Sequence, residues 1–134
     1  MKTGIITGTG KGIGLSALKL LLKKNYKVIS ITKTKSKELE TLSKNKNFIK
    51  NIYHPLGENL ITDRELVRKI YKKYKIDFLV CNAGVRHRDS LKNMNSEKRN
   101  HTLNVNYHSN VVLIEELLKI YYKKKPPINI VCIS

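Results

Sequence analysis

Short apolar blocks alternate along this chain with longer stretches in which apolar residues recur every three or four positions. The short blocks are rich in β-branched residues, which favours strands. They are GIITG at 4–8, KVISIT at 27–32, NFIKNIY at 47–53, IDFLVC at 76–81 and INIVCIS at 128–134. We expect IDFLVC, an almost continuous apolar run, to be covered on both faces of its sheet.

The longer stretches have the period of amphipathic helices. The first helix ends at Asn25 and has its apolar positions at Leu15, Ala17, Leu18, Leu21 and Leu22. A short helix is expected around 38–43. The next begins with Thr62 and Glu65, spaced as in a capping box, and its apolar positions are Leu66, Val67, Ile70 and Tyr74.

A long helix is predicted from Ser96 to about Tyr122, ended by Pro126 and Pro127. Its apolar positions are Leu103, Tyr107, Val111, Ile114, Leu118 and Tyr121. Strands that alternate with helices form βαβ units, which close into a parallel sheet with helices on both faces. The sequence therefore predicts an α/β chain with a Rossmann-like, doubly wound sheet of about five strands, in a single domain over residues 1–134.

Composition removes several classes of protein from consideration. No apolar run approaches the roughly 18–20 residues that span a bilayer, and the first residues lack the apolar core of a signal peptide. Cys81 and Cys132 have no metal-ligand spacing, so we expect buried thiols in a reducing compartment and a cytoplasmic protein.

The net charge of +17 raises the possibility of a nucleic-acid partner. The basic residues are mostly lysine, however, and abundant Lys, Asn, Ile and Tyr are typical of an AT-rich genome. The lysines fall on predicted solvated helix faces, without the aromatic residues of a nucleic-acid module. We expect no specific nucleic-acid binding, only nonspecific attraction to polyanions at low salt.

The segment TGTGKGIG, residues 7–14, lies between the first strand and the first helix. An α/β sheet binds phosphate at this place, at the positive end of a helix. Gly8 suits a tight turn, Gly12 allows a pyrophosphate to approach the backbone, and Gly14 allows the helix to pack closely on the strands. A plain turn is the alternative, and the strand–loop–helix context favours cofactor binding.

These residues resemble the short-chain dehydrogenase/reductase family. Thr7-Gly8-x-x-x-Gly12-Ile13-Gly14 is similar to its N-terminal cofactor motif, and DFLVCNAG at 77–84 is similar to its D-x-L-V-N-N-A-G. Val105-Asn106 resembles the V-N of the following helix, and IVCIS at 130–134 resembles I-V-N-I-S-S. The resemblance covers essentially the whole chain. It implies strand order 3-2-1-4-5, a sheet incomplete relative to the family, and hydride transfer between a nicotinamide cofactor and a carbonyl or alcohol carbon.

The choice of cofactor depends on the end of the second strand, where a carboxylate would bind the ribose 2′-hydroxyl of NAD(H). Thr32 and Lys33 occupy this place, and Lys11 occupies a position that is basic in NADP(H)-dependent family members. The sequence therefore favours NADP(H) over NAD(H), with random placement in a lysine-rich chain as the alternative. The expected cofactor-binding residues are Thr7, Gly8, Lys11, Gly12, Ile13, Gly14, Thr32, Lys33, Asn82, Ala83 and Gly84.

Two further departures from the family concern the cofactor site. The family's aspartate after the third strand, which touches adenine, has no counterpart in NIYHPLGENL at 51–60. Cys81 replaces the first asparagine of N-N-A-G, so a polar contact to the glycine loop is expected to be lost. His54, His87, His101 and His108 lack metal-ligand spacing. His87, with Arg88, follows the N-A-G turn and could face substrate, but surface-loop positions are expected for these two.

The family's chemistry uses a tyrosine as general acid/base, a lysine four residues later, a serine and a helix asparagine. Asn106 corresponds to the asparagine, and the serine is either Ser134 or the next residue. The Tyr-x-x-x-Lys pair would follow the serine strand and is absent. Tyr71/Lys75 and Tyr121/Lys125 have this spacing but precede that strand, and solvated helix faces are expected for both.

We therefore expect a truncated family member without catalysis by itself. The alternatives are a non-catalytic NADP(H)-binding module, or a cofactor half that pairs with another chain. Self-association or a protein partner would use the long helix, 96–122, or the edge of the fifth strand.

Overall fold

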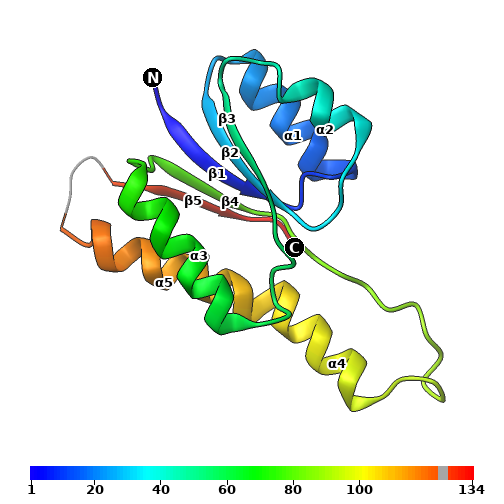
Figure 1. Ribbon diagram of the computed structural model, residues 1–134. Helices are drawn as coiled ribbons and strands as arrows, with labels where there is room; N and C mark the ends of the chain where they lie inside the picture. The colour runs from blue at the N-terminus through cyan, green and yellow to red at the C-terminus, as the bar shows by residue number, and fades with distance from the viewer. Residues whose placement is uncertain (124–126) are drawn as a thin grey trace.

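The computed structural model describes residues 1–123 and 127–134 and contains one sheet (Figure 1). Its strands are β1 (Thr3–Thr7), β2 (Lys27–Thr32), β3 (Phe48–Tyr53), β4 (Phe78–Cys81) and β5 (Asn129–Cys132). Neighbouring strands are all parallel, in the order β3-β2-β1-β4-β5. This arrangement confirms the Rossmann-like α/β fold and the predicted strand order 3-2-1-4-5.

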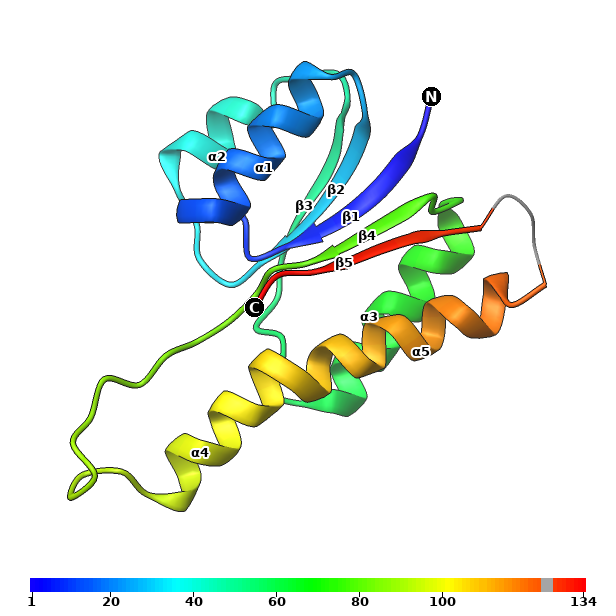
Figure 2. The same ribbon diagram turned by 180° about the vertical axis from the view of Figure 1, so that it is seen from behind.

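The helices lie on both faces of the sheet (Figures 1 and 2). They are α1 (Gly12–Lys23), α2 (Lys37–Leu42), α3 (Leu60–Lys73), α4 (Ser96–Leu103) and α5 (Ser109–Tyr121). One core, with Ile6 and Val28 of the sheet, packs under α1 and α2. The other, with Ile5 and Leu79, packs under α3 and α5. None of the described helices is long and apolar enough to cross a membrane.

Strand β4 is less covered than its apolar run predicts. Leu79 and Cys81 are fully buried toward α3 and α5, whereas Phe78 and Val80 on the other face are only half-buried. The reason is that α1 and α2 lie over the half of the sheet formed by β1, β2 and β3 (Figure 2). The expectation of burial on both faces is therefore wrong.

Two helix termini test the sequence signals directly. Asn25 ends α1 as predicted, with a left-handed φ of 61° and the paired backbone hydrogen bonds of a Schellman motif. The capping box at Thr62 is wrong, because α3 begins two residues earlier. The Asn59 side chain accepts hydrogen bonds from the backbone N–H groups of Ile61 and Thr62 and so satisfies the first turn.

The long helix forms as predicted but contains a π-helical turn, η1 (Asn104–His108), between α4 and α5. Its buried apolar residues are Val105, Val112, Leu113 and Leu117. The stripe predicted from the sequence is only partly correct. Val111, Ile114 and Tyr121 are half-buried, and the last two pack against the core, whereas Leu103, Tyr107 and Leu118 are exposed. Lys125 and Pro126, assigned to the end of this helix and to the second tyrosine–lysine pair, lie outside the described residues.

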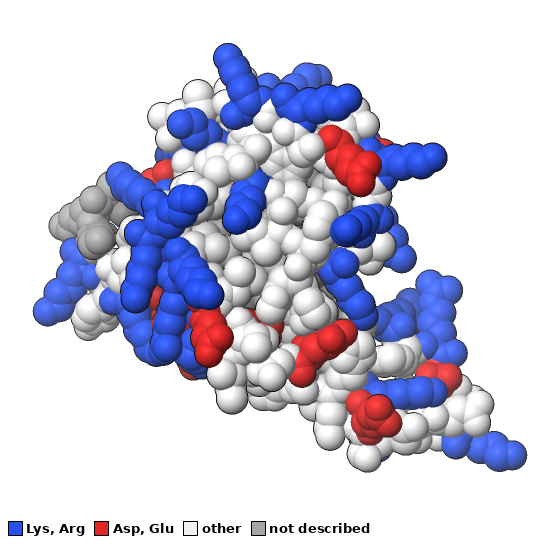
Figure 3. All heavy atoms as spheres, in the orientation of Figure 1, with Lys and Arg blue, Asp and Glu red and all other residues white. Residues whose placement is uncertain are grey.

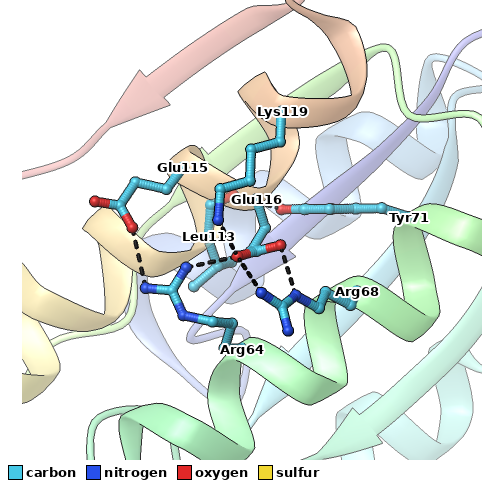
Figure 4. A network of polar contacts seen from close by, with 7 residues as sticks. All are labelled: Arg64, Arg68, Tyr71, Leu113, Glu115, Glu116 and Lys119. Atoms are coloured by element: carbon cyan, nitrogen blue, oxygen red, sulfur yellow. Dashed lines mark hydrogen bonds and ion pairs between the residues drawn. The ribbon is translucent and has the colours of Figure 1, made fainter.

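A buried carboxylate joins α3 to α5 (Figure 4). The Glu116 side chain is 5% exposed and accepts hydrogen bonds from Arg64 Nη1 at 2.5 Å, Arg68 Nε at 2.9 Å and Lys119 Nζ at 3.0 Å. Arg68 chiefly, with Lys119 and Arg64, lowers the pKa of Glu116 to about 2, although burial acts in the opposite direction. The carboxylate is therefore ionised and paired at neutral pH.

Tyr71 and Tyr121, the tyrosines of the two pairs with Tyr-x-x-x-Lys spacing, both make hydrogen bonds within the fold. Tyr71 is buried and donates its hydroxyl to the Leu113 carbonyl at 2.9 Å, and burial raises its pKa. The half-buried Tyr121 accepts a hydrogen bond from the backbone N–H of Ile76 at 2.8 Å. The expectation of solvated helix faces is wrong for both side chains, but neither lines the cavity described below.

Basic side chains are dispersed over the surface. Figure 3 shows lysine and arginine over much of the face drawn, gathered most densely over α3, with acidic side chains beside them. Lys72, Lys73 and Lys75 are exposed at the end of α3, as expected for a solvated helix face. One of the two cysteines departs from expectation, because Cys81 is buried but Cys132 is exposed.

Candidate functional site

A cavity of about 530 Å³ lies at the carboxyl ends of the strands. Parallel α/β sheets bind ligands at this edge, and the volume is typical of a small-molecule site. The predicted residues that line it are Gly8, Lys11, Gly12, Ile13, Thr32, Lys33, Asn82, Ala83 and Gly84. Thr7, Gly14, Asn106 and Ser134 do not line it.

The glycine loop folds as its spacing predicts. Gly8 has φ of +69°, a conformation that L side chains rarely adopt, and a Cβ there would approach the Ala83 backbone at 2.8 Å. A Cβ on Gly14 would overlap the Gly8 carbonyl oxygen, so α1 can only pack this closely without a side chain. Gly12 borders open space, with nothing within 4 Å of a Cβ placed there.

The first turn of α1 borders the cavity. Lys11, the residue before the helix, makes no side-chain hydrogen bond to it, and the first turn contains no acidic residue. The first N–H groups of a helix lack intrahelical partners and carry its partial positive charge. The end of α1 therefore offers uncapped donors beside open space, which suits an anionic group such as a phosphate.

Thr7 and Asn82 join the glycine loop to the end of β4. The Thr7 hydroxyl accepts hydrogen bonds from the backbone N–H groups of Asn82 and Ala83, at 3.0 and 2.9 Å. The Asn82 side-chain amide donates to the carbonyls of Thr7 and Gly8, at 3.2 and 3.0 Å. Asn82 thus makes polar contacts to the loop, while the neighbouring Cys81 packs in the apolar core.

Lys33 and Glu58 form an ion pair at the cavity wall. The Lys33 ammonium lies 3.3 Å from the Glu58 carboxylate, and both side chains are largely exposed. Both residues line the cavity, as does the buried Thr32. The sequence analysis identified Lys33 but not Glu58, which belongs to the segment after β3.

His54, from the same segment, is also a cavity residue, and the sequence analysis did not assign it to the site. Its Nε2 lies 2.7 Å from Oδ1 of Asp63, a fully buried carboxylate that also accepts the backbone N–H of Gly57 at 2.9 Å. Asp63 therefore fixes the His54 ring at the cavity wall. The buried Leu56 lies between them in sequence and lines the cavity as well.

Asn106 belongs to the π-helical turn and contacts the segment after β4. Its Oδ1 accepts the backbone N–H of Val85 at 2.7 Å, and its Nδ2 donates to the Val85 carbonyl at 3.0 Å. Val85 and Val105 line the cavity, so Asn106 supports the wall rather than forming it. Ser134 is exposed.

His87 and His101, which the sequence analysis did not identify as a pair, lie beside this wall of the cavity. His87 Nε2 is 3.1 Å from His101 Nδ1, and His101 lines the cavity. His87, half-buried, belongs to the segment after β4, and His101 belongs to α4. The contact joins two segments separated by 14 positions and was not recoverable from spacing alone.

The strand order, the glycine loop and a cavity at the carboxyl edge define a Rossmann-like α/β protein. The family model for short chain dehydrogenases matches residues 2–134, and the chain belongs to this family. The 3-oxoacyl-[acyl-carrier-protein] reductase FabG of Rickettsia prowazekii is 32% identical over 124 residues, which cover 92% of this chain and 50% of that protein. The chain thus spans about half the length of the curated relatives it matches.

Solved structures agree on the fold. 4-Hydroxyisoleucine dehydrogenase complexed with NADH has a TM-score of 0.88 at 22% identity, covering 100% of this chain and 55% of that one. A short chain dehydrogenase from Burkholderia cenocepacia J2315 in complex with NADP has a TM-score of 0.76 at 20% identity, covering 88% and 50%. Related folds therefore bind either nicotinamide dinucleotide.

Proposed function

We propose that this chain is the NADP(H)-binding part of a short-chain dehydrogenase/reductase. The observation that carries the proposal is the uncapped N-terminus of α1, which borders open space at Gly12 inside a cavity of suitable size. Gly12, Ile13 and the helix end would hold the pyrophosphate. When bound, the nicotinamide would supply hydride exchange with a carbonyl or alcohol carbon.

The proposed preference for NADP(H) rests on charge at the end of β2. Thr32 and Lys33 line the cavity there, and Lys11 lines it beside the glycine loop. Two ammonium groups favour a 2′-phosphate, whereas NAD(H)-binding sites use a carboxylate at the end of the second strand. Glu58 opposes this preference, because its carboxylate already engages Lys33.

Calorimetric titration of the 134-residue chain with NADPH and NADH, in parallel, tests both the binding of a nucleotide and the preference for NADP(H). The Lys33→Asp variant should bind NADPH at least tenfold more weakly, as expected for losing a charge-assisted contact, with NADH affinity changed much less. Lys35→Asp is the matched control, since Lys35 is exposed and lies outside the cavity lining. Equal losses for both nucleotides would reject the role of Lys33, and no binding of either would reject nucleotide binding altogether.

We propose that the chain does not catalyse hydride transfer by itself. Asn106 is engaged with the Val85 backbone, Ser134 is outside the cavity lining, and neither Tyr71 nor Tyr121 reaches the cavity. Purified protein should leave NADPH absorbance unchanged with a panel of ketone and aldehyde substrates. Turnover that survives repurification and disappears in Asn82→Ala would contradict this proposal.

A second proposal concerns protein partners. Leu103, Tyr107 and Leu118 form an exposed apolar stripe along α4 and α5, 47–61% exposed. Such a stripe favours association with a second copy or with another chain that completes the enzyme. Light scattering coupled to size exclusion would show a dimer or larger species, and a monomer at micromolar concentration would count against self-association.

A further inference from the structure

The chain contains two cysteines among its 134 residues, and the fold places them opposite one another. Cys81 ends β4 and Cys132 ends β5, and they are paired neighbours in the register of these parallel strands. The backbone N–H of Ile133 donates to the Cys81 carbonyl at 2.9 Å, which holds the two strand ends together. Side chains of paired residues on adjacent strands lie on the same face of a sheet, and both thiols are free.

The two thiols differ in environment. Cys132 is exposed on the edge strand, whereas Cys81 is fully buried in the core under α3 and α5. Burial chiefly, and then the neighbouring Cys132, raise the pKa of Cys81 to about 12. An oxidant in solution therefore reaches Cys132 first, and Cys81 is positioned to react with the product.

The strand geometry permits a bond between them. Adjacent strands lie about 4.8 Å apart, which falls within the Cα separation of roughly 4.4–6.8 Å found in disulfides. A bridge imposed on a regular strand pair has little freedom to reach its preferred dihedral angles, and strained disulfides are readily reduced. The pair therefore suits reversible oxidation better than permanent cross-linking.

We propose that Cys81 and Cys132 form a redox modification site that closes an intrachain disulfide on exposure to hydrogen peroxide. The Cys132 sulfur attacks the peroxide, the O–O bond breaks, and Cys132 sulfenic acid and one water form. Cys81 first loses its proton to the solvent, and its thiolate attacks the Cys132 sulfur. The S–O bond breaks, and the leaving hydroxide takes a proton from the solvent to give a second water. Two thiols lose two electrons and one peroxide gains them.

The experiment treats dilute native protein with hydrogen peroxide, alkylates remaining thiols after unfolding, and analyses peptides by mass spectrometry. We expect a Cys81–Cys132 cross-linked peptide in monomeric protein, lost on treatment with dithiothreitol. Because the step needs the Cys81 thiolate, closure should accelerate about tenfold per pH unit between neutral and alkaline pH. A free Cys81 thiol beside oxidised Cys132, at every pH tested, would overturn the proposal.

Two single variants test whether oxidation of one cysteine depends on the presence of the other or only on its own exposure to solvent. In Cys81→Ser, peroxide should leave Cys132 as a sulfenic acid that dimedone traps, or as a disulfide between two chains. In Cys132→Ser, Cys81 should remain reduced, since it is buried and has lost its partner. Oxidation of Cys81 in Cys132→Ser at the wild-type rate would show that the pair does not act as a unit and would equally overturn the proposal.

Discussion

The carboxylate of Glu116 provides a test of the packing between α3 and α5. The Glu116 side chain is only 5% exposed, and three basic groups within 3.0 Å keep its carboxylate ionised. Glu116→Gln preserves the shape of the side chain but removes the charge, so Arg68 loses its carboxylate partner and Arg64 keeps only Glu115. The basic side chains are 30–59% exposed and regain water when the charge is removed, so the cost is the loss of the charge-assisted hydrogen bonds to Glu116.

The pKa gives the size of this effect. Its fall from 4.5 to about 2 spans roughly 2.5 pH units, and at about 1.36 kcal/mol per unit this corresponds to about 3 kcal/mol. The folded-state pKa is lowered, so the stabilisation is complete above pH 4.5 and is lost as pH falls toward 2. We expect Glu116→Gln to lower the free energy of unfolding at pH 7 by about 3 kcal/mol.

Urea unfolding followed by circular dichroism measures this difference. Glu115→Gln is the control, because Glu115 is 50% exposed and bonds only Arg64 among the described contacts, so its loss should cost less than about 1 kcal/mol. Equal destabilisation by both substitutions would refute the reasoning. So would a difference between wild type and Glu116→Gln that already declines between pH 7 and 5, above the range in which this carboxylate titrates.

Three other substitutions have defined outcomes. Glu58→Gln frees Lys33 from its ion pair and should raise NADPH affinity about two- to fivefold by calorimetry, with NADH affinity unchanged; a fall in NADPH affinity would contradict competition at this site. Asn106→Ala removes both hydrogen bonds to the Val85 backbone and should weaken nucleotide binding several-fold while the secondary structure by circular dichroism persists; unchanged affinity would separate Asn106 from the cavity. Leu118→Lys places a charge in the exposed stripe and should lower the mass measured by light scattering toward that of one chain.

The sheet and the glycine loop were predictable because their determinants are local. Each strand lies in a short, largely apolar run, and the three glycines are close in sequence, with Gly8 in the loop after β1 and Gly12 and Gly14 in the first turn of α1. The Asn25 helix end is local in the same way. Asn59 was also a recoverable signal, since asparagine is among the preferred N-cap residues, but the Thr62–Glu65 spacing gave a competing N-cap three residues later.

The long helix shows why a hydrophobic period does not identify the buried face. The buried apolar residues lie on η1 and α5, and the predicted stripe follows the edge of this buried face, with Leu103, Tyr107 and Leu118 exposed. The structure places Glu116 on the buried face, beside Leu113 and Leu117. A carboxylate in a predicted core position argues against that face unless its basic partners are known, and here they come from α3, some 50 positions earlier in the chain.

The cavity wall that we propose discriminates NADP(H) from NAD(H) depends on pairing between strands. Thr32 is in register with Tyr53, and the His54 N–H bonds the Thr32 carbonyl at 2.9 Å, so the residue after β2 lies beside the segment after β3. This register places Glu58 against Lys33. A lysine at the end of β2 favours a 2′-phosphate by itself, but its effective charge depends on this neighbour from another strand. Phosphate recognition by the loop can therefore be predicted from one segment, whereas the strength of cofactor discrimination follows only from the parallel register of two.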